Sequence, residues 1–272
     1  MSFVPLTRRP AQHLVTLLIA LGLHLHSPAQ THTPMQAEAS PPSATDRTAN
    51  VAVDAPQPLA LAWGVGLFQY REPGWMRLTG PEATLQAQYR PTSASTSWWP
   101  ERLQADLGVA LLDYTSDTTG RLHHRAGLNG RGTALWDIHA SDSGTWLAGA
   151  QIDLAWTDLR GTSSSGHRGY RRLGSKAWVV LRHETAAGAH AEVGALLRGR
   201  QDSLLSHLGG RDVTNSQRRG HYLLYQHTPL EGPGLRPRPW ARYSEIGRSD
   251  NDGIYYEPRN RSLQLGVLFD WP

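Results

Sequence analysis

A two-residue alternation of apolar and polar side chains constrains this chain more than any other feature of its sequence. From Trp146 to Trp156 every even position is apolar, whereas the odd positions include Gln151 and Asp153. A strand points successive side chains to opposite faces, so it would place these two polar residues together. The two tryptophans are ten residues apart, which on a strand tilted by about 40° spans roughly 25 Å, the height of the apolar band of a membrane β-barrel. The segment therefore predicts a transmembrane β-strand.

Four further segments repeat this alternation: 83–90, 103–111, 191–198 and 263–271. In each, one face is apolar and the other combines small and polar residues, which fits a barrel lumen better than the outside of a soluble sheet. The polar residues that the alternation assigns to a luminal network are Arg90, Gln104, Asp106, Gln151, Asp153, Glu192, Arg198 and Arg242. The aromatic residues that it assigns to the lipid interface are Trp146, Trp156, Phe269 and Trp271.

Ten candidate strands can be placed along the chain, and together they predict an all-β fold. They lie near 60–70, 82–90, 102–113, 132–140, 145–158, 176–184, 189–200, 221–228, 236–246 and 261–271. Pro237 and Pro239 cannot donate to a ladder, so they are expected at the start of their strand or beside a break in pairing. The expected architecture is an antiparallel up-and-down transmembrane β-barrel of ten strands, with eight or twelve strands left open.

The connections between these strands alternate in length. Those after even-numbered strands are short, as at 141–144, 185–188 and 229–234, with 91–101 as the exception. Those after odd-numbered strands are longer, at 71–81, 114–131, 159–175, 201–220 and 247–260. Bacterial outer-membrane barrels have short periplasmic turns and longer extracellular loops. The pattern therefore predicts a protein of the Gram-negative outer membrane with both chain ends in the periplasm.

The N-terminal region has the order of features that marks exported proteins. Arg8 and Arg9 precede the apolar run 14–25, and small residues follow at 27–29. This order predicts a signal peptide over 1–29, and the run is too short for the roughly 20 residues of a membrane-spanning helix. The stretch 30–58 is rich in Pro, Ala, Ser and Thr, which predicts a disordered periplasmic linker before a barrel domain over 59–272.

Composition excludes several other classes of protein. The chain has no cysteine, so it has neither a disulfide framework nor thiolate chemistry. Its mean hydropathy of −0.46 argues against a helical membrane protein, but a barrel strand shows lipid only at every second residue. No long block of like charge occurs, so no nucleic-acid partner is expected.

Three short stretches resemble parts of known outer-membrane proteins. The last strand alternates apolar residues and ends in Trp271, as does the C-terminal strand that the barrel-assembly machinery reads, although Pro272 follows. The stretches 70–76 and 255–260 resemble loops of small, uncharacterised outer-membrane β-barrel proteins of Gram-negative bacteria. This resemblance implies fold, location and the assembly machinery as a partner during insertion, and it implies no activity.

The interior allows two functions. Its mixed charges favour a filled lumen whose groups pair, since barrels of eight strands are filled by side chains and water-filled porins have about 16 strands. We therefore expect a structural or surface-binding role, with a narrow porin-like diffusion channel as the alternative. An outer-membrane hydrolase ranks third, because no GxSxG motif occurs and the loop carboxylates and histidines have no spacing that brings them together. The expectation is therefore a protein that is not an enzyme, with no catalytic or metal residues and no cofactor.

The loops offer candidate contacts outside the lumen. If the first and last strands pair, a recognition patch would form from Tyr70, Glu72, Trp75, Tyr255, Tyr256 and Glu257. The alternative is that these two loops only pack together over the barrel seam. Arginine pairs in the loops also suit phosphate groups through bidentate geometry, so outer-membrane lipid and lipopolysaccharide are the expected partners.

Overall fold

The structure is a computed structural model that describes residues 58–91, 98–117, 120–160, 170–204, 212–230, 236–250 and 257–271. The expected signal peptide 1–29 lies outside the described residues, as does all of the expected linker 30–58 except its last residue. Within the described ranges no helix is long and apolar enough to cross a membrane. The structure contains β1 (Leu59–Glu72), β2 (Met76–Tyr89), β3 (Arg102–Ser116), β4 (Gly120–Ser141), β5 (Gly144–Asp158), β6 (Arg171–Thr185), β7 (His190–Leu204), β8 (Val213–Gln217), β9 (Gly220–Gln226), β10 (Pro237–Ile246) and β11 (Asn260–Asp270).

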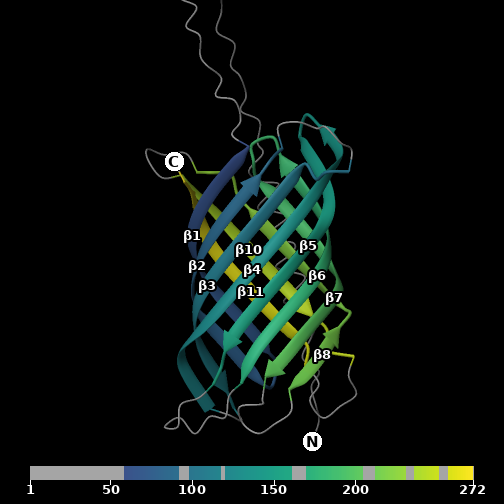
Figure 1. The fold of residues 1–272 in the computed structure, drawn as a ribbon. Coiled ribbons are helices and arrows are strands. Elements are labelled where there is room, and N and C mark those ends of the chain that lie inside the picture. The colour runs from purple at the N-terminus through teal and green to yellow at the C-terminus, as the bar shows by residue number, and fades with distance from the viewer. Residues whose placement is uncertain are drawn as a thin grey trace, which may run out of the picture. The chain divides into compact units, whose positions relative to one another are not determined.

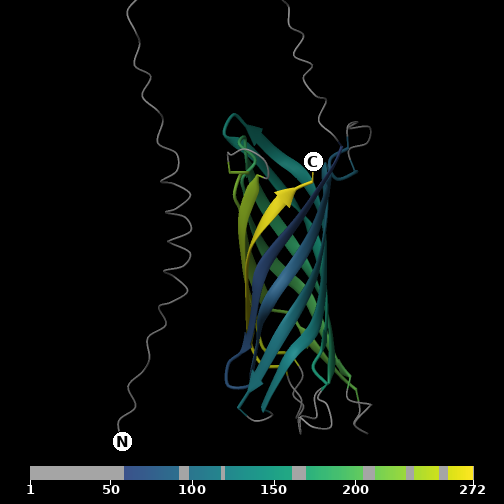
Figure 2. The same ribbon diagram turned by 90° about the vertical axis from the view of Figure 1, so that its left-hand side faces the viewer.

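These strands form one closed antiparallel barrel (Figure 1). β8 pairs with the C-terminal half of β7 and β9 pairs with its N-terminal half, so β8 and β9 together make one interrupted strand. The circuit then reads β1–β2–β3–β4–β5–β6–β7–β9–β10–β11 and closes where β11 pairs with β1, as Figure 2 shows. The expected fold and strand count of ten are confirmed, and counts of eight or twelve are excluded.

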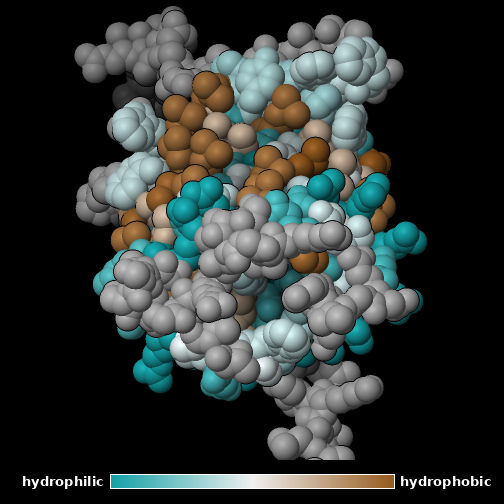
Figure 3. Space-filling view, turned by 60° about the horizontal axis from the view of Figure 1, so that its bottom comes forward, coloured by the Kyte–Doolittle hydropathy of each residue, from teal (hydrophilic) through white to brown (hydrophobic). Residues whose placement is uncertain are grey.

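The outer wall carries the apolar side of the alternation. Val65 and Leu67 on β1 and Leu107 on β3 are more than half exposed, while Ala62 and Asp106 on the opposite faces of these strands are buried. Figure 3 shows hydrophobic residues gathered on the outer wall and hydrophilic ones toward the end that faces the viewer. An apolar exterior around a partly polar interior is the reverse of a soluble protein, so the barrel is built to have lipid around it.

The two ends of the barrel differ, but less than the sequence predicts. The long connections expected at 71–81 and 114–131 are wrong, because β1 continues to Glu72, β2 begins at Met76 and β4 begins at Gly120. Gly74 closes the first of these hairpins with a φ of 81°, a backbone conformation that favours glycine. We call the end with the connections 73–75 and 117–119 the loop end, and the end with the turns at 142–143 and 186–189 the turn end.

A β-bulge in β7 reverses which residues face inward. Arg198 pairs with Ala177 and Leu196 pairs with Trp178, so Leu197 is an extra residue without a partner on β6. Two consecutive residues, Leu197 and Arg198, therefore face outward. The assignment of Arg198 to the lumen is wrong for this reason, since an alternation continued across a bulge gives the wrong face.

Candidate functional site: the luminal network and cavity

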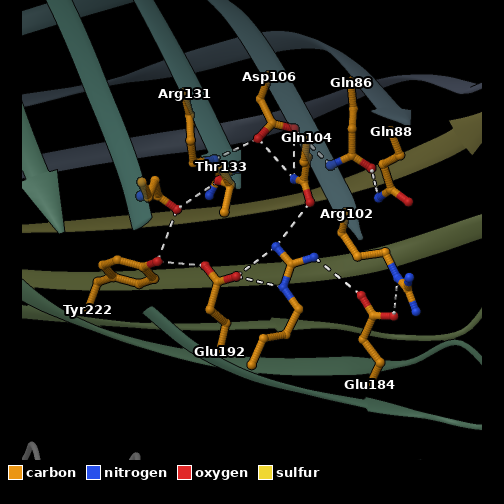
Figure 4. A network of polar contacts seen from close by, with 12 residues as sticks. Gln86, Gln88, Arg102, Gln104, Asp106, Arg131, Thr133, Glu184, Glu192 and Tyr222 are labelled. Atoms are coloured by element: carbon orange, nitrogen blue, oxygen red, sulfur yellow. Dashed lines mark hydrogen bonds and ion pairs between the residues drawn. The ribbon is translucent and has the colours of Figure 1, made fainter. Parts of the chain in front are cut away.

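Asp106 on β3 is the first centre of the network in the lumen (Figure 4). Its carboxylate accepts hydrogen bonds from Gln86 at 2.8 Å, Gln104 at 3.0 Å and Arg131 at 2.6 Å. All four side chains come from the neighbouring strands β2, β3 and β4, where alternation places them on the inner face. The donors satisfy both carboxylate oxygens, which is what a charge removed from water requires.

Arg182 on β6 links this group to the facing wall. Its guanidinium donates to Glu192 on β7 at 2.7 Å and to the amide oxygen of Gln104 on β3 at 3.0 Å. Tyr222 on β9 donates to the other oxygen of Glu192 at 2.6 Å. The sequence assigned Glu192 and Gln104 to the lumen but not Arg182, although it lies at an even position of a strand whose even positions face inward.

Asp153 on β5 is the second centre. It accepts from Gln151 at 2.8 Å, from the indole nitrogen of Trp178 at 2.9 Å and from Arg242 at 2.9 Å. Arg242 lies on β10, and the shorter path around the circuit from β5 passes through β6, β7 and β9. The Arg242–Asp153 ion pair therefore crosses the bore rather than joining neighbouring strands.

A second set of polar side chains crosses the bore near the loop end. Arg172 on β6 is buried and pairs with Glu72 on β1 at 3.1 Å and with Glu257. It also donates to Gln201 and to Tyr70, whose ring lies 4.5 Å from the guanidinium carbon. β6 and β1 lie on opposite sides of the circuit, because β7, β9, β10 and β11 separate them one way and β5 to β2 the other.

This arrangement corrects the expected recognition patch. Tyr70, Glu72 and Glu257 do come together, but each is buried in the barrel mouth around Arg172 instead of on the surface. Tyr70 and Glu72 occupy inward-facing even positions of β1, and Glu257 lies in the segment that leads into β11. The buried guanidinium of Arg172 offsets the cost of burying the two carboxylates. Of the expected residues that the structure describes, only Trp75 is exposed, at the tip of the first hairpin. Tyr255 and Tyr256 lie outside the described residues.

Apolar side chains fill the interior beside these networks, which the sequence did not predict. One buried cluster, toward the loop end, contains Tyr70, Met76, Leu78, Ala110, Leu112, Tyr114, Leu122 and Leu159. The other contains Leu135, Leu147, Trp178, Val180, Leu196, Tyr222, Leu224 and Ile246. The rings of Trp178 and Tyr222 meet edge to face, with centroids 4.9 Å apart. The lumen is therefore a packed core with polar crossings.

A cavity of about 140 Å³ lies in the lumen. Asp106 and Asp153 line one part of it and Arg172 and Gln201 another, so it lies between the two polar crossings. Lys176, the single lysine of the chain, also lines it. The room is enough for several water molecules, since one water needs roughly 10–15 Å³ by this kind of measure.

The remaining expected residues lie at the rim or on the outer wall. Arg90 is largely exposed at the turn end, where it reaches Glu184 at 3.4 Å, so it belongs to the rim rather than to the lumen. Trp146 and Trp271 are exposed on the outside. Trp156 and Phe269 are half-buried on outward-facing rows, and Phe269 stacks on Trp63 with centroids 4.8 Å apart.

In chemical terms, the carboxylates at the centre of the luminal network are already bonded to other groups of the protein. Among the described residues, no three His, Asp or Glu side chains lie close enough to form a metal site. The carboxylates of Asp106, Asp153 and Glu192 accept from arginine, amide, indole or hydroxyl groups. The arrangement can hold the barrel walls together and block the bore.

Comparisons with known proteins bear on the fold alone. No protein-family model matches the chain, and no curated protein matches it. The chain is similar to Neisserial surface protein A, with 13% identity, a TM-score of 0.31 and coverage of 78% of this chain and 97% of that one. The transport unit of the autotransporter AIDA-I from Escherichia coli is similar with 8% identity and a TM-score of 0.34, and the match covers 80% of this chain and 92% of that one. The translocator domain of the autotransporter NalP from Neisseria meningitidis is similar with 12% identity and a TM-score of 0.37, and the match covers 78% of this chain and 87% of that one. Identity and TM-score are both low, so nothing about activity or partners is transferred from these proteins.

Proposed function

We propose that the chain is an outer-membrane β-barrel with a structural or surface-binding role, that its interior is closed to most solutes, and that it is not an enzyme. The apolar outer wall supports insertion into lipid. A closed barrel satisfies all its backbone hydrogen bonds within the wall, as a membrane requires. In the proposed orientation, the turn end and both ends of the barrel domain face the periplasm.

The observation that carries the closed interior is that ion pairs cross the bore at two levels. Arg242 reaches Asp153 at one level, and Arg172 reaches Glu72 at the other. Both sit among buried side chains, so a solute would have to separate charge pairs in order to pass. Removing one partner of such a pair leaves an uncompensated charge, which costs about 3–5 kcal/mol.

Planar-bilayer recording of the purified barrel tests this proposal. We expect small or no steady conductance from the wild-type protein. The variant with Arg172→Ala, Tyr222→Ala and Arg242→Ala removes side chains from both crossings, and we expect it to conduct. Conductance of this variant would show that the protein inserts, so that the silence of the wild type reflects a blocked bore. Heat-modifiable migration on a gel checks that both forms are folded.

The cavity beside Lys176 favours one alternative, a narrow diffusion channel. A space of about 140 Å³ is already open between the crossings. Rotation of Arg172 and Arg242 out of the bore would extend it toward both ends. A large, stable conductance of the wild-type protein would establish this channel in place of the closed barrel.

A further inference from the structure

Four arginines form a line across the outer wall at the loop end. Arg261 on β11 lies directly opposite Arg71 on β1, and Arg71 lies directly opposite Arg77 on β2. Arg77 is opposite Thr115 on β3, which is in turn opposite Arg121 on β4. The four arginines are exposed and occupy outward-facing positions. The row therefore runs over five adjacent strands.

This row places like charges where a sheet normally avoids them. Residues directly opposite on antiparallel strands have Cβ atoms about 5 Å apart, and like charges at such positions destabilise the pairing. Arg261 is compensated by Glu245, at 3.0 Å. Arg71, Arg77 and Arg121 form no ion pair with a described residue, and Arg77 faces the side-chain amide of Gln69. The nearby outward carboxylate, Asp113, is engaged by His123 at 3.3 Å and by the amide of His124 at 3.1 Å.

The height of the row on the wall indicates what compensates it. Leu67 on β1, Pro81 on β2 and Leu111 on β3 are the last apolar outward residues before the row, each four positions away from it. Four residues on a strand tilted by about 40° rise roughly 10 Å. The Cα atoms of the row thus lie a few ångströms beyond the headgroup layer, which covers about 5–7 Å outside each face of the hydrocarbon. The long arginine side chains can bend back and bring their guanidinium groups into this layer.

We propose that Arg71, Arg77 and Arg121 form a binding site for the phosphate groups of a phosphorylated glycolipid in the outer leaflet. Guanidinium groups bind phosphate through paired, charge-assisted hydrogen bonds. A line of three on one wall suits a lipid with more than one phosphate, whose acyl chains lie along the apolar surface below. This inference rests on the proposed outer-membrane location, but its test uses purified protein and lipid and does not depend on whether the barrel conducts.

Binding of bisphosphorylated lipid A to the folded barrel in neutral detergent, measured by native mass spectrometry, is the test. The variant with Arg71→Gln, Arg77→Gln and Arg121→Gln should bind this lipid at least about tenfold more weakly than the wild type. The matched control changes Arg171, Arg198 and Arg200 to Gln. It removes the same charge from the outer wall, but none of these arginines is directly opposite another: Arg171 is opposite Asp158 and Leu204, and Arg198 is opposite Ala177. Arg200 is opposite Ser175 and is paired with Asp202 at 3.0 Å. We expect this control to bind within about twofold of the wild type.

Two further arms identify the occupant. The wild type should bind dephosphorylated glycolipid no more tightly than the row variant binds it, since only the acyl-chain contacts remain. Inorganic phosphate at the same concentration should not displace the lipid, and displacement would overturn the lipid as occupant in favour of free phosphate. Equal losses in the row variant and in its control would overturn the site itself, because only general charge would then matter.

Thermal unfolding provides a readout that a folding defect cannot imitate. In neutral detergent without phosphorylated lipid, the row variant should be at least as stable as the wild type, because it lacks the cross-strand repulsion. Adding lipid A should raise the unfolding temperature of the wild type and of the control, but not that of the row variant. A row variant that is less stable without lipid would show that the arginines are compensated within the protein, which would overturn the proposal.

Discussion

At the scale of single residues, Asp153 shows why replacing a luminal carboxylate by its amide should destabilise the barrel. Three donors converge on it: the amide of Gln151, the indole of Trp178 and the guanidinium of Arg242. A carboxylate accepts at both oxygens, whereas an asparagine accepts at one and presents donors at the other. The substitution therefore turns at least one hydrogen bond into a contact between two donors.

We predict that Asp153→Asn lowers the free energy of unfolding by about 3–5 kcal/mol, because it leaves the charge of Arg242 without its carboxylate and one buried donor without an acceptor. Urea-dependent unfolding in lipid vesicles measures the change. Asp142→Asn is the matched control, in the exposed turn between β4 and β5, and should stay within about 0.5 kcal/mol of the wild type. If the two variants are equally stable, Asp153 does not accept these bonds in the folded barrel.

Gly194 is a position where the absence of a side chain allows two elements to approach closely. A Cβ built on it would lie 2.0 Å from the ring of Tyr222, whose hydroxyl donates to Glu192. We predict that Gly194→Ala displaces this ring and destabilises the barrel by about 1–3 kcal/mol. Gly132→Ala is the matched control, since a Cβ there meets nothing within 4 Å. Equal unfolding midpoints in urea for both variants would contradict the contact.

At the scale of strands, the sequence predicts the parts of the barrel in which alternation is unbroken. The inner faces around Asp106 and Asp153 follow from counting by two, because β3 and β5 keep one parity throughout. Arg198 shows the limit, since an extra residue inserted before it leaves no mark in the hydrophobic pattern. A bulge is defined by the pairing with the next strand, which a single segment does not contain.

The hairpins at the loop end were missed for a different reason. The outward positions of β1 and β2 near the turn carry Gln69, Arg71 and Arg77, so the apolar alternation that marked the strands stops before the strands do. Backbone pairing continues beyond the apolar band. The outward residues can be polar there, because water or headgroups surround that part of the strands. The contacts across the bore, such as Arg172 with Glu72, also could not be read from sequence, because they depend on how the barrel closes.

The bulge in β7 gives a prediction for four successive positions. The chain has no cysteine, so single cysteines at 196, 197, 198 and 199 can each carry a nitroxide without interference. In lipid vesicles we expect high accessibility to dissolved oxygen at 197 and 198, and low accessibility at 196 and 199, because only the middle two face outward. Strict alternation over the four positions would show that the bulge is absent.

At the scale of the whole molecule, the outer wall differs between its two ends. Aromatic residues gather toward the turn end, where Trp63 stacks on Phe269 and the rings of Trp146 and His183 are 4.7 Å apart. Arginines that form no ion pair with a described residue gather at the loop end, in the row that contains Arg71 and Arg77. In an asymmetric membrane the arginine end is stabilised by the leaflet with more exposed phosphate. This difference supports a loop end that faces the cell exterior.

Epitope insertion in whole cells tests this orientation with two turns of similar size. One tag follows Gly74 at the loop end, and the other lies between Asp142 and Ser143 at the turn end; both are exposed tips, which tolerate insertion. We expect an antibody to label the tag after Gly74 on intact cells. It should reach the tag at 142–143 only after the outer membrane is permeabilised, because that turn faces the periplasm. The reverse result would place the arginine row in the inner leaflet, away from the phosphorylated glycolipid, and would contradict the orientation and the row's proposed ligand together.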